Sequence, residues 1–272
     1  SVNRKLYFQA DGTMSREVPA GAEVVTETLN KVAAEFGNVV KGESASNKAQ
    51  PSPLSTDESL SVSSSSNNVL IVVLAFKDQP VIDSVKFGDQ KLLELKTKNT
   101  DFGDGSSSFS AIYFLNNPNP STSQVSAYWG DSQEYEGAIA AFEVIGVENE
   151  NLFGAITESV AIDDVLSVEL ESSNGNIIFD VAITIGSGNP GSFTEGSGQN
   201  IILDNDGTNS VKVSSSYKVA ESGLNSTSWT GGKNASQIAT EISGSYTSTN
   251  FGISPLVCDS LVIGDGMIEA KT

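Results

Sequence analysis

Residues 69–76 form the longest unbroken apolar run in the chain, and this run limits the possible folds more than any other feature. It is too short to cross a bilayer as a helix, which needs roughly 20 apolar residues. It is rich in β-branched side chains and follows a Ser/Asn cluster at 63–68, a pattern typical of a strand buried on both faces. We therefore expect a central strand of a β-sandwich.

The region from about Leu60 to Gly244 alternates strand-like segments with turn signals and shows no helical pattern. Asn174 and Gly175 separate two of these segments and favour a type I′ hairpin between them. No internal repeat stands out. The pattern predicts a mainly β protein built as an antiparallel sandwich. The expected strands are 60–62, 69–76, 81–87, 91–95, 109–115, 125–129, 138–144, 160–171, 177–185, 201–203, 211–219, 226–230 and 238–242.

The N-terminal part contains the one helix that the sequence predicts, at about 22–36. Glu23 and Glu27 lie where the helix dipole favours negative charge, and Gly37 suits the position after the last turn. We consider two interpretations: the apolar stripe packs on its own domain, or it mediates assembly with neighbouring copies. The stripe consists of Val25, Leu29, Val32 and Phe36.

Composition divides the chain into four parts. Residues 1–40 form an N-terminal arm with a short strand and the helix. Residues 41–58 are polar and contain two prolines, which is typical of a linker. Residues 59–245 form the main β domain, and 246–272 form a C-terminal extension.

Charge and residue usage exclude several classes of function. The 34 acidic and 15 basic residues give a net charge of −19, so nucleic-acid binding is not expected. The chain has no histidine, which excludes Ser-His-Asp and Cys-His catalysis and His-ligated metal sites. No segment is long and apolar enough to predict membrane insertion. We expect a protein that is not an enzyme.

Exposed aromatic residues are one candidate for a binding site. Tyr128, Trp129 and Trp229, together with Tyr217, have the side chains on which sugar rings stack. The alternative is that these rings pack in the core or at strand ends, as aromatic residues of sandwiches often do.

Acidic residues suggest two further sites. Asp101 and Asp104, and likewise Asp204 and Asp206, lie beside glycine turns and resemble fragments of calcium loops. Neither pair has the distal Glu of a complete calcium loop, so the alternative is that both are ordinary Asp-Gly turns. We expect no cofactor other than calcium. Glu134, Glu136, Asp163 and Asp164 include candidates for a glycosidase pair, or they are simply surface acids.

Several segments resemble the lectin-like jelly-roll domain of bacteriophage virion proteins and secreted bacterial proteins. The resemblance covers about 59–244, roughly two-thirds of the chain. It implies a jelly-roll sandwich used for display, adhesion or assembly, and it supplies no catalytic residues. The segments that carry it are 70–76, 85–88, 113–118, 125–129, 141–147, 216–217, 228–229 and 238–242.

These features lead to a first hypothesis of function, a structural display protein of a phage-like virion, such as a capsid decoration or fibre-type component. Its arm would bind other virion or self subunits as a homo-oligomer, and its jelly roll would face outward on the virion surface. The start at Ser1 and the lack of a signal-peptide core in residues 1–30 favour this hypothesis. The alternatives are a secreted carbohydrate-binding or adhesion module that binds host-surface glycans, and a carboxylate-based glycan hydrolase.

Overall fold

The computed structural model describes residues 7–8, 14–15, 29–31, 35–44, 53–64, 67–131, 133–148, 151–161, 165–186, 190–244, 246–248, 260–264 and 267–271. The chain divides into two compact units, one of residues 1–30 and 247–272 and one of residues 31–246. In the first unit, β1 (Tyr7–Phe8) pairs with β2 (Met14–Ser15), and β24 (Ser260–Gly264) pairs with β25 (Met267–Lys271). All regular elements in the described parts of the chain are strands, so the expectation of a mainly β, antiparallel protein is confirmed.

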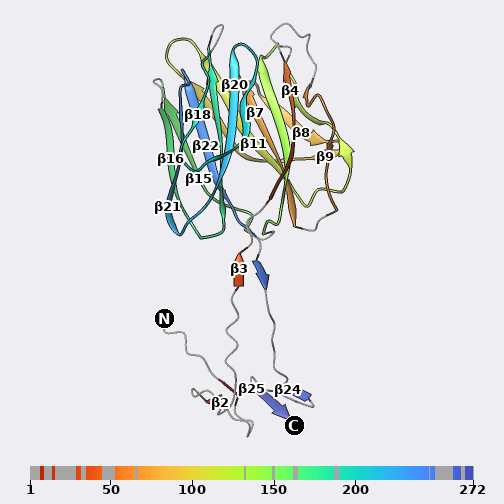
Figure 1. Cartoon of the computed structure of the whole chain (residues 1–272). Coiled ribbons are helices and arrows are strands. Elements are labelled where there is room, and N and C mark those ends of the chain that lie inside the picture. The colour runs from red at the N-terminus through yellow and green to blue at the C-terminus, as the bar shows by residue number, and fades with distance from the viewer. Residues whose placement is uncertain are drawn as a thin grey trace. The chain divides into compact units, whose positions relative to one another are not determined.

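The second unit, residues 31–246, contains two five-stranded sheets, a four-stranded sheet, a three-stranded sheet and a short two-stranded ladder (Figure 1). The first inner sheet has the order β10 (Leu93–Asp101), β11 (Ser107–Asn116), β7 (Asn68–Phe76), β14 (Gly137–Ile145), β4 (Glu35–Ser44). The first outer sheet has the order β5 (Leu54–Ser55), β13 (Val125–Trp129), β8 (Ile82–Phe87), β9 (Gln90–Lys91). A short ladder joins β6 (Leu60–Ser61) to β12 (Thr122–Ser123).

The remaining strands form the other two sheets. The second inner sheet has the order β15 (Phe153–Ala161), β22 (Ala235–Ile242), β17 (Ile177–Ile185), β20 (Val211–Val219), β19 (Asn200–Gly207). The second outer sheet has the order β16 (Val165–Ser172), β21 (Gly223–Thr230), β18 (Thr194–Glu195). At the two ends of this unit, β3 (Leu29–Lys31) lies beside β23 (Tyr246–Ser248).

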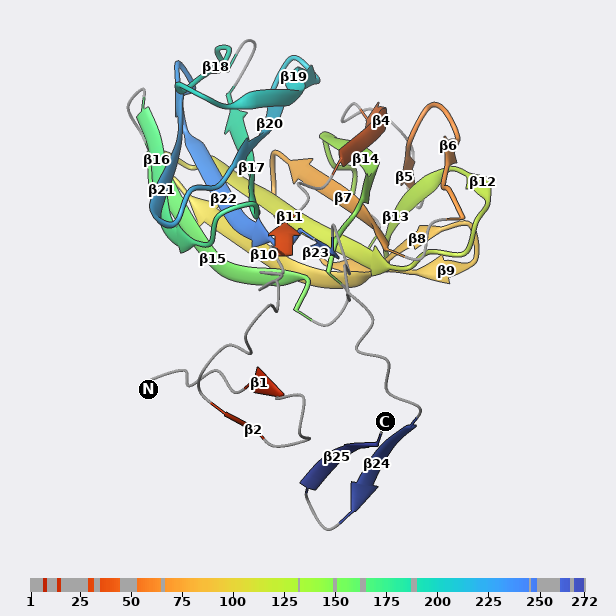
Figure 2. The ribbon, with the colours of Figure 1, turned by 60° about the horizontal axis from the view of Figure 1, so that its bottom comes forward.

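The four sheets stack as layers, with the two inner sheets face to face. One apolar core lies between the inner sheets and contains alternate residues of β7 (Val69, Ile71, Val73) and of β17 (Ile177, Phe179, Val181). The opposite face of β7 packs on the first outer sheet, and that of β17 packs on the second outer sheet. Figure 2 shows β8 and β13 at one side of the stack and β16 and β21 at the other.

This layering explains the unbroken apolar run at 69–76, which lies in β7. Every residue of β7 is buried, and so is every residue of β17. The expectation that 69–76 is a central strand with both faces buried is therefore confirmed. Its second face is buried by another inner sheet, so the large unit has more layers than one two-layer sandwich.

The two halves of the unit have the same strand connectivity. We call β4–β14 (35–145) the first repeat and β15–β22 (153–242) the second repeat. The inner sheets correspond strand for strand as β10-β11-β7-β14-β4 and β19-β20-β17-β22-β15, and the outer sheets as β5-β13-β8 and β16-β21-β18. The ladders match in register as well, because the β14–β4 and β22–β15 pairs carry a bulge at the same place, after Phe142 and Thr240. The chain is thus an internal structural duplication, which the sequence analysis did not detect.

One polar contact, buried in the first repeat and half-buried in the second, occurs in both repeats. In the first, Glu143 accepts hydrogen bonds from the backbone and hydroxyl of Ser63 and from Asn68. In the second, Glu241 accepts hydrogen bonds from Ser172 and Asn176. Each Glu is on the last strand of its repeat, and its cross-strand partner is Leu70 in the first repeat and Ile178 in the second. Each Asn lies two residues before that partner. We call these contacts the Asn–Glu latches.

The N-terminal predictions need correction. Residues 22–28 and 32–34, with Val25 and Val32, lie outside the described residues, but Leu29 is in β3 and Phe36 is in β4. Phe36 stacks on Tyr217 with ring centroids 4.4 Å apart, so it packs in the core and is not an exposed assembly residue. Pairing of β4 with β14 outweighs the helical spacing of these apolar residues. The large unit therefore begins before residue 59, and 41–44 continue a strand.

The hairpin expected around Asn174 and Gly175 is also wrong. β16 pairs with β21, whereas β17 pairs with β20 and β22. The Asn-Gly turn therefore connects an outer sheet to an inner sheet. Only Gly175 has a positive φ there, whereas a type I′ turn needs two such residues.

We expect the Asn–Glu latch to stabilise the first repeat. Glu143 is only 5% exposed, and Glu143→Ala leaves three hydrogen-bond donors without their acceptor. A buried unpaired group costs about 1–3 kcal/mol, so urea unfolding should show a loss of about 3 kcal/mol. Glu171→Ala, on an exposed position of β16, is the control and should change stability by about 0.5 kcal/mol or less. Equal stability of the two variants would contradict a structural role for the latch.

Candidate functional site

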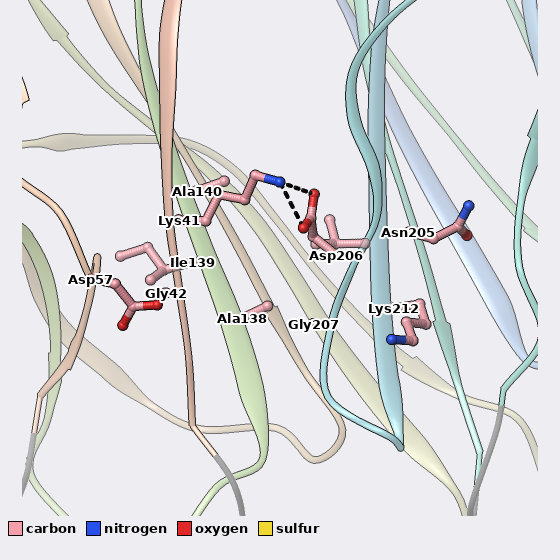
Figure 3. Close-up of a pocket in the computed structure, with 11 residues that line it drawn as sticks. Lys41, Gly42, Asp57, Ala138, Ile139, Ala140, Asn205, Asp206, Gly207 and Lys212 are labelled. Carbon is pink, nitrogen blue, oxygen red and sulfur yellow. Dashed lines mark hydrogen bonds and ion pairs between the residues drawn. The ribbon is translucent and has the colours of Figure 1, made fainter.

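A pocket of about 380 Å³ lies where the two repeats meet, between β4 and β14 of the first and β19 and β20 of the second. Apolar and polar residues both line it, and Figure 3 shows most of them. The apolar lining residues are Ala138, Ile139, Ala140 and Val213, and the polar lining residues, which we call the rim, are Lys41, Asp57, Asn205, Asp206 and Lys212.

The rim is set by local backbone features of β4 and β19. Gly42 has no space for a side chain, because a Cβ there would lie 1.9 Å from the carbonyl oxygen of Ser55. On the other side, β19 is irregular between Leu203 and Asp206, and Asn205 has a positive φ of 51°. The side chain of Asn205 binds the backbone N–H and carbonyl of Phe193. These contacts hold both walls of the pocket in place.

An ion pair crosses the pocket. The Lys41 ammonium donates to both carboxylate oxygens of Asp206, at 2.7 and 2.8 Å, and Figure 3 shows the two side chains pointing toward each other. The lining thus combines the ammonium groups of Lys41 and Lys212 and the carboxylates of Asp57 and Asp206 with apolar residues. This arrangement suits a small polar ligand with several hydroxyl groups.

A second cavity, of about 460 Å³, lies at another place where the two repeats meet. It is formed by the β10–β11 turn of the first repeat and the residues before β22 of the second. Its polar residues are Lys77, Asp104, Ser106, Lys233 and Asn234. Both cavities are therefore products of the junction between the repeats.

The aromatic candidates are placed differently from the expectation of a sugar-stacking platform. Trp129 and Trp229 are only 5% and 2% exposed, so neither offers a face to a ligand. Trp129 packs edge-on against Phe76, and Trp229 packs on Phe193. Tyr128 is 38% exposed and lies under the Lys86 ammonium, while Tyr217 stacks on Phe36. The alternative of core packing is therefore correct for both tryptophans.

The calcium candidates already have partners within the chain. Asp101 accepts the N–H of Gly103, and Asp104 accepts hydrogen bonds from Ser106 and Asn234, which lower the pKa of Asp104 to about 2. Asp204 accepts a hydrogen bond from Asn205, and Asp206 pairs with Lys41. The described residues contain no group of three or more acidic, Cys or His side chains that could hold a metal ion. The two Asp pairs therefore act in turns and in the junction between the repeats.

Only two of the four candidates for a glycosidase pair, Glu134 and Glu136, lie within the described residues. Asp163 and Asp164 lie outside the described residues. Glu134 is exposed, and Glu136 accepts a hydrogen bond from Thr208 in the β19–β20 turn.

Asp180 is the most unusual ionisable residue in the structure, and the sequence analysis overlooked it. It is fully buried on β17 and accepts hydrogen bonds from Ser216, Trp229 and Gln237. Burial raises the pKa of this carboxyl, because removal from water disfavours its charged form. The signal for this residue in the sequence was that Asp180 is the one charged residue in the apolar strand predicted at 177–185.

Comparisons with protein-family models, with curated proteins and with solved structures found no match. In the described part of the chain, no helix has the length and apolar character needed to cross a membrane.

Asp180 predicts a specific pH dependence of stability. Its pKa in the folded state is raised above the ordinary value of about 3.9, so the folded protein holds this proton more tightly than the unfolded chain does. The contribution of Asp180 to the unfolding free energy is therefore complete below about pH 4 and is lost as the pH rises through the raised pKa. Asp180→Asn cannot titrate, so its unfolding free energy should fall less steeply over this range. Chemical unfolding of both proteins at a series of pH values measures the difference, and parallel profiles would refute it.

Proposed function

We propose that the chain is a non-enzymatic structural display protein of a phage-like particle, in which the 31–246 unit is presented outward and the remaining segments take part in assembly. The observation that carries this proposal is the strand order of the two repeats. With the strands of a repeat numbered 1 to 8, the inner sheet contains 1-8-3-6 and the outer sheet 2-7-4. These seven strands follow the order that they have in a jelly roll, an architecture used by capsid and lectin domains, and this agreement supports the proposal.

One strand of the pattern is shared between sheets. In a jelly roll, strand 5 follows strand 4 in the second sheet. In the first repeat, β9 pairs with β8 in the outer sheet, and β10 pairs with β11 at the edge of the inner sheet. Only Leu92 separates β9 from β10. In this interpretation β9 takes the place of strand 5 in the outer sheet, and β10 is an additional strand of the inner sheet.

The ends of the large unit also favour display. Lys31 and Tyr246 belong to the adjacent strands β3 and β23, so the chain enters and leaves the unit at one place. Attachment through such a site leaves the two outer sheets free to face the surroundings. The acidic composition, with a net charge of −19, supports an outward-facing protein that does not bind neighbours unspecifically.

Solution mass tests the assembly part of this proposal. We expect the full chain to form a defined oligomer by light scattering and the fragment 31–246 to be monomeric. The fragment must include β4, because a start at Ser59 would remove an edge strand of the first inner sheet. A monomeric full chain would contradict self-assembly through the residues outside 31–246.

A secreted carbohydrate-binding or adhesion module remains the alternative, and the pocket at Lys41 is the observation that favours it. If the pocket binds glycans, an array should show binding by the full chain that falls at least tenfold in Lys212→Ala, which removes one rim group. Lys218→Ala, on the same strand but not in the pocket lining, is the control. Absence of glycan binding by the unmodified chain would remove this alternative.

A further inference from the structure

The contacts between the repeats follow an approximate two-fold relation. In the first inner sheet, Lys41 is opposite Ala140 on β14, and in the second, Glu158 is opposite Ile238 on β22. Ala140 and Ile238 are equivalent because each is three residues before the latch glutamate. Lys41 and Glu158 therefore occupy the same position of the two repeats.

Their partners are also equivalent to each other. Asp206 is opposite Val213 on β20, and Lys98 is opposite Ser110 on β11. Val213 lies three residues before Ser216, the cross-strand partner of Asp180. In the same way, Ser110 lies three residues before Tyr113, the cross-strand partner of Val72. Since Asp180 and Val72 correspond on β17 and β7, Asp206 and Lys98 occupy one equivalent position.

The two ends of the junction therefore contain the same contact with the charges inverted. At one end Lys41 binds Asp206 at 2.7 Å, and at the other Glu158 binds Lys98 at 2.5 Å. Lys96 adds a second bond to Glu158 at 2.5 Å. Both positions of the contact are cations in the first repeat, Lys41 and Lys98, and both are anions in the second, Glu158 and Asp206.

Other contacts obey the same relation, which shows that the charge pairs are not an isolated coincidence. Phe36 stacks on Tyr217 at 4.4 Å, and the equivalent Phe153 contacts Phe114 at 4.8 Å. Glu136, just before β14, binds Thr208 in the β19–β20 turn. The equivalent Asn234, just before β22, binds Asp104 and Ser106 in the β10–β11 turn. Reciprocal contacts of this kind define an isologous interface, the type formed by symmetric dimers.

We propose that this interface is charge-coded, so that a first repeat pairs with a second repeat and rejects another copy of itself. Two first repeats in the same geometry would place Lys41 against Lys98 at both ends. Two second repeats would place Glu158 against Asp206 at both ends. Unlike pairing satisfies all four positions, so the pattern selects the partner by repulsion as well as by attraction. The interface surface of a first repeat thus fits a second repeat, of the same chain or of a second copy. It excludes the first repeat of a second copy.

The test removes the code while keeping every ion pair within the chain. In Lys41→Glu/Asp206→Lys, each end of the interface still has an acid opposite a lysine. Both repeats now have an acid at position one and a lysine at position two, so like repeats become complementary. The matched control exchanges two exposed residues in and beside the β8–β9 hairpin, Asp89→Lys/Lys91→Glu.

Full-length proteins are unfolded in urea, refolded at high concentration and separated by size with light scattering. We expect the dimer fraction of the Lys41→Glu/Asp206→Lys protein to rise several-fold above that of the unmodified chain and of the control. The difference should become smaller at about 1 M salt, where the Debye length falls to about 3 Å. Equal dimer fractions in the three proteins at low salt would overturn the proposal.

A second measurement covers the case in which the doubly substituted protein refolds poorly. Lys41→Glu and Asp206→Lys are compared singly and together by their urea midpoints. If the two side chains interact across the interface, each single change lowers the midpoint and the pair restores most of the loss. Additive effects would show that the charges do not select the partner.

Discussion

The structure depends on covering both faces of two strands. All residues of β7 and β17 are buried, so each inner sheet needs an apolar layer on each side. One side is covered by the outer sheet of the same repeat and the other by the inner sheet of the other repeat. A single repeat would expose the residues of the central core, among them Ile71, Phe142 and Val144, as a broad apolar face. Soluble proteins rarely expose such a face, so each repeat requires a partner of the same shape.

The polar features are arranged around this central core. The inner sheets of the two repeats meet where the ion pairs, the turn contacts and both cavities lie. The charged side chains of the ion pairs, on β4, β10, β15 and β19, lie at the margin of the apolar layer. Three carboxylates lie on the other faces of the inner sheets, Glu143 and Asp180 buried and Glu241 half-buried. Glu143 and Glu241 each accept a bond from an Asn at or just before the central strand, and Asp180 binds Trp229 of the outer sheet. The apolar layer thus joins the repeats, while hydrogen bonds of these carboxylates lie within each repeat.

The sequence predicted the strands that are mainly apolar, because burial on two faces leaves a simple pattern. The segments 69–76, 109–115, 138–144, 177–185 and 211–219 all lie within observed strands. Short or polar strands such as β4 and β18 were missed, since their pairing depends on distant strands and not on local propensity. The duplication escaped notice because equivalent positions have different side chains: Val72 and Asp180, Phe142 and Thr240, Lys41 and Glu158. Each pair occupies a geometrically similar site in which different chemistry satisfies the same packing. The burial of Trp129 and Trp229 could not be predicted for a related reason, since the exposure of each ring depends on which layer covers it.

The inversion of charge follows from joining the two repeats in one chain. In a dimer of identical subunits, each substitution occurs twice, so a contact between position one and position two must be complementary within a single sequence. Once the repeats share a chain, each end of the interface can change separately. The pair at one end is Lys41 with Asp206 and at the other Glu158 with Lys98, and only the combination of unlike repeats is complementary. The two cavities at the junction also differ, because the first is lined by Lys41 and Asp206 on β4 and β19 and the second by Asp104 and Lys233 near strand ends. A ligand that fits the Lys41 pocket is therefore not expected to fit the cavity at Lys233.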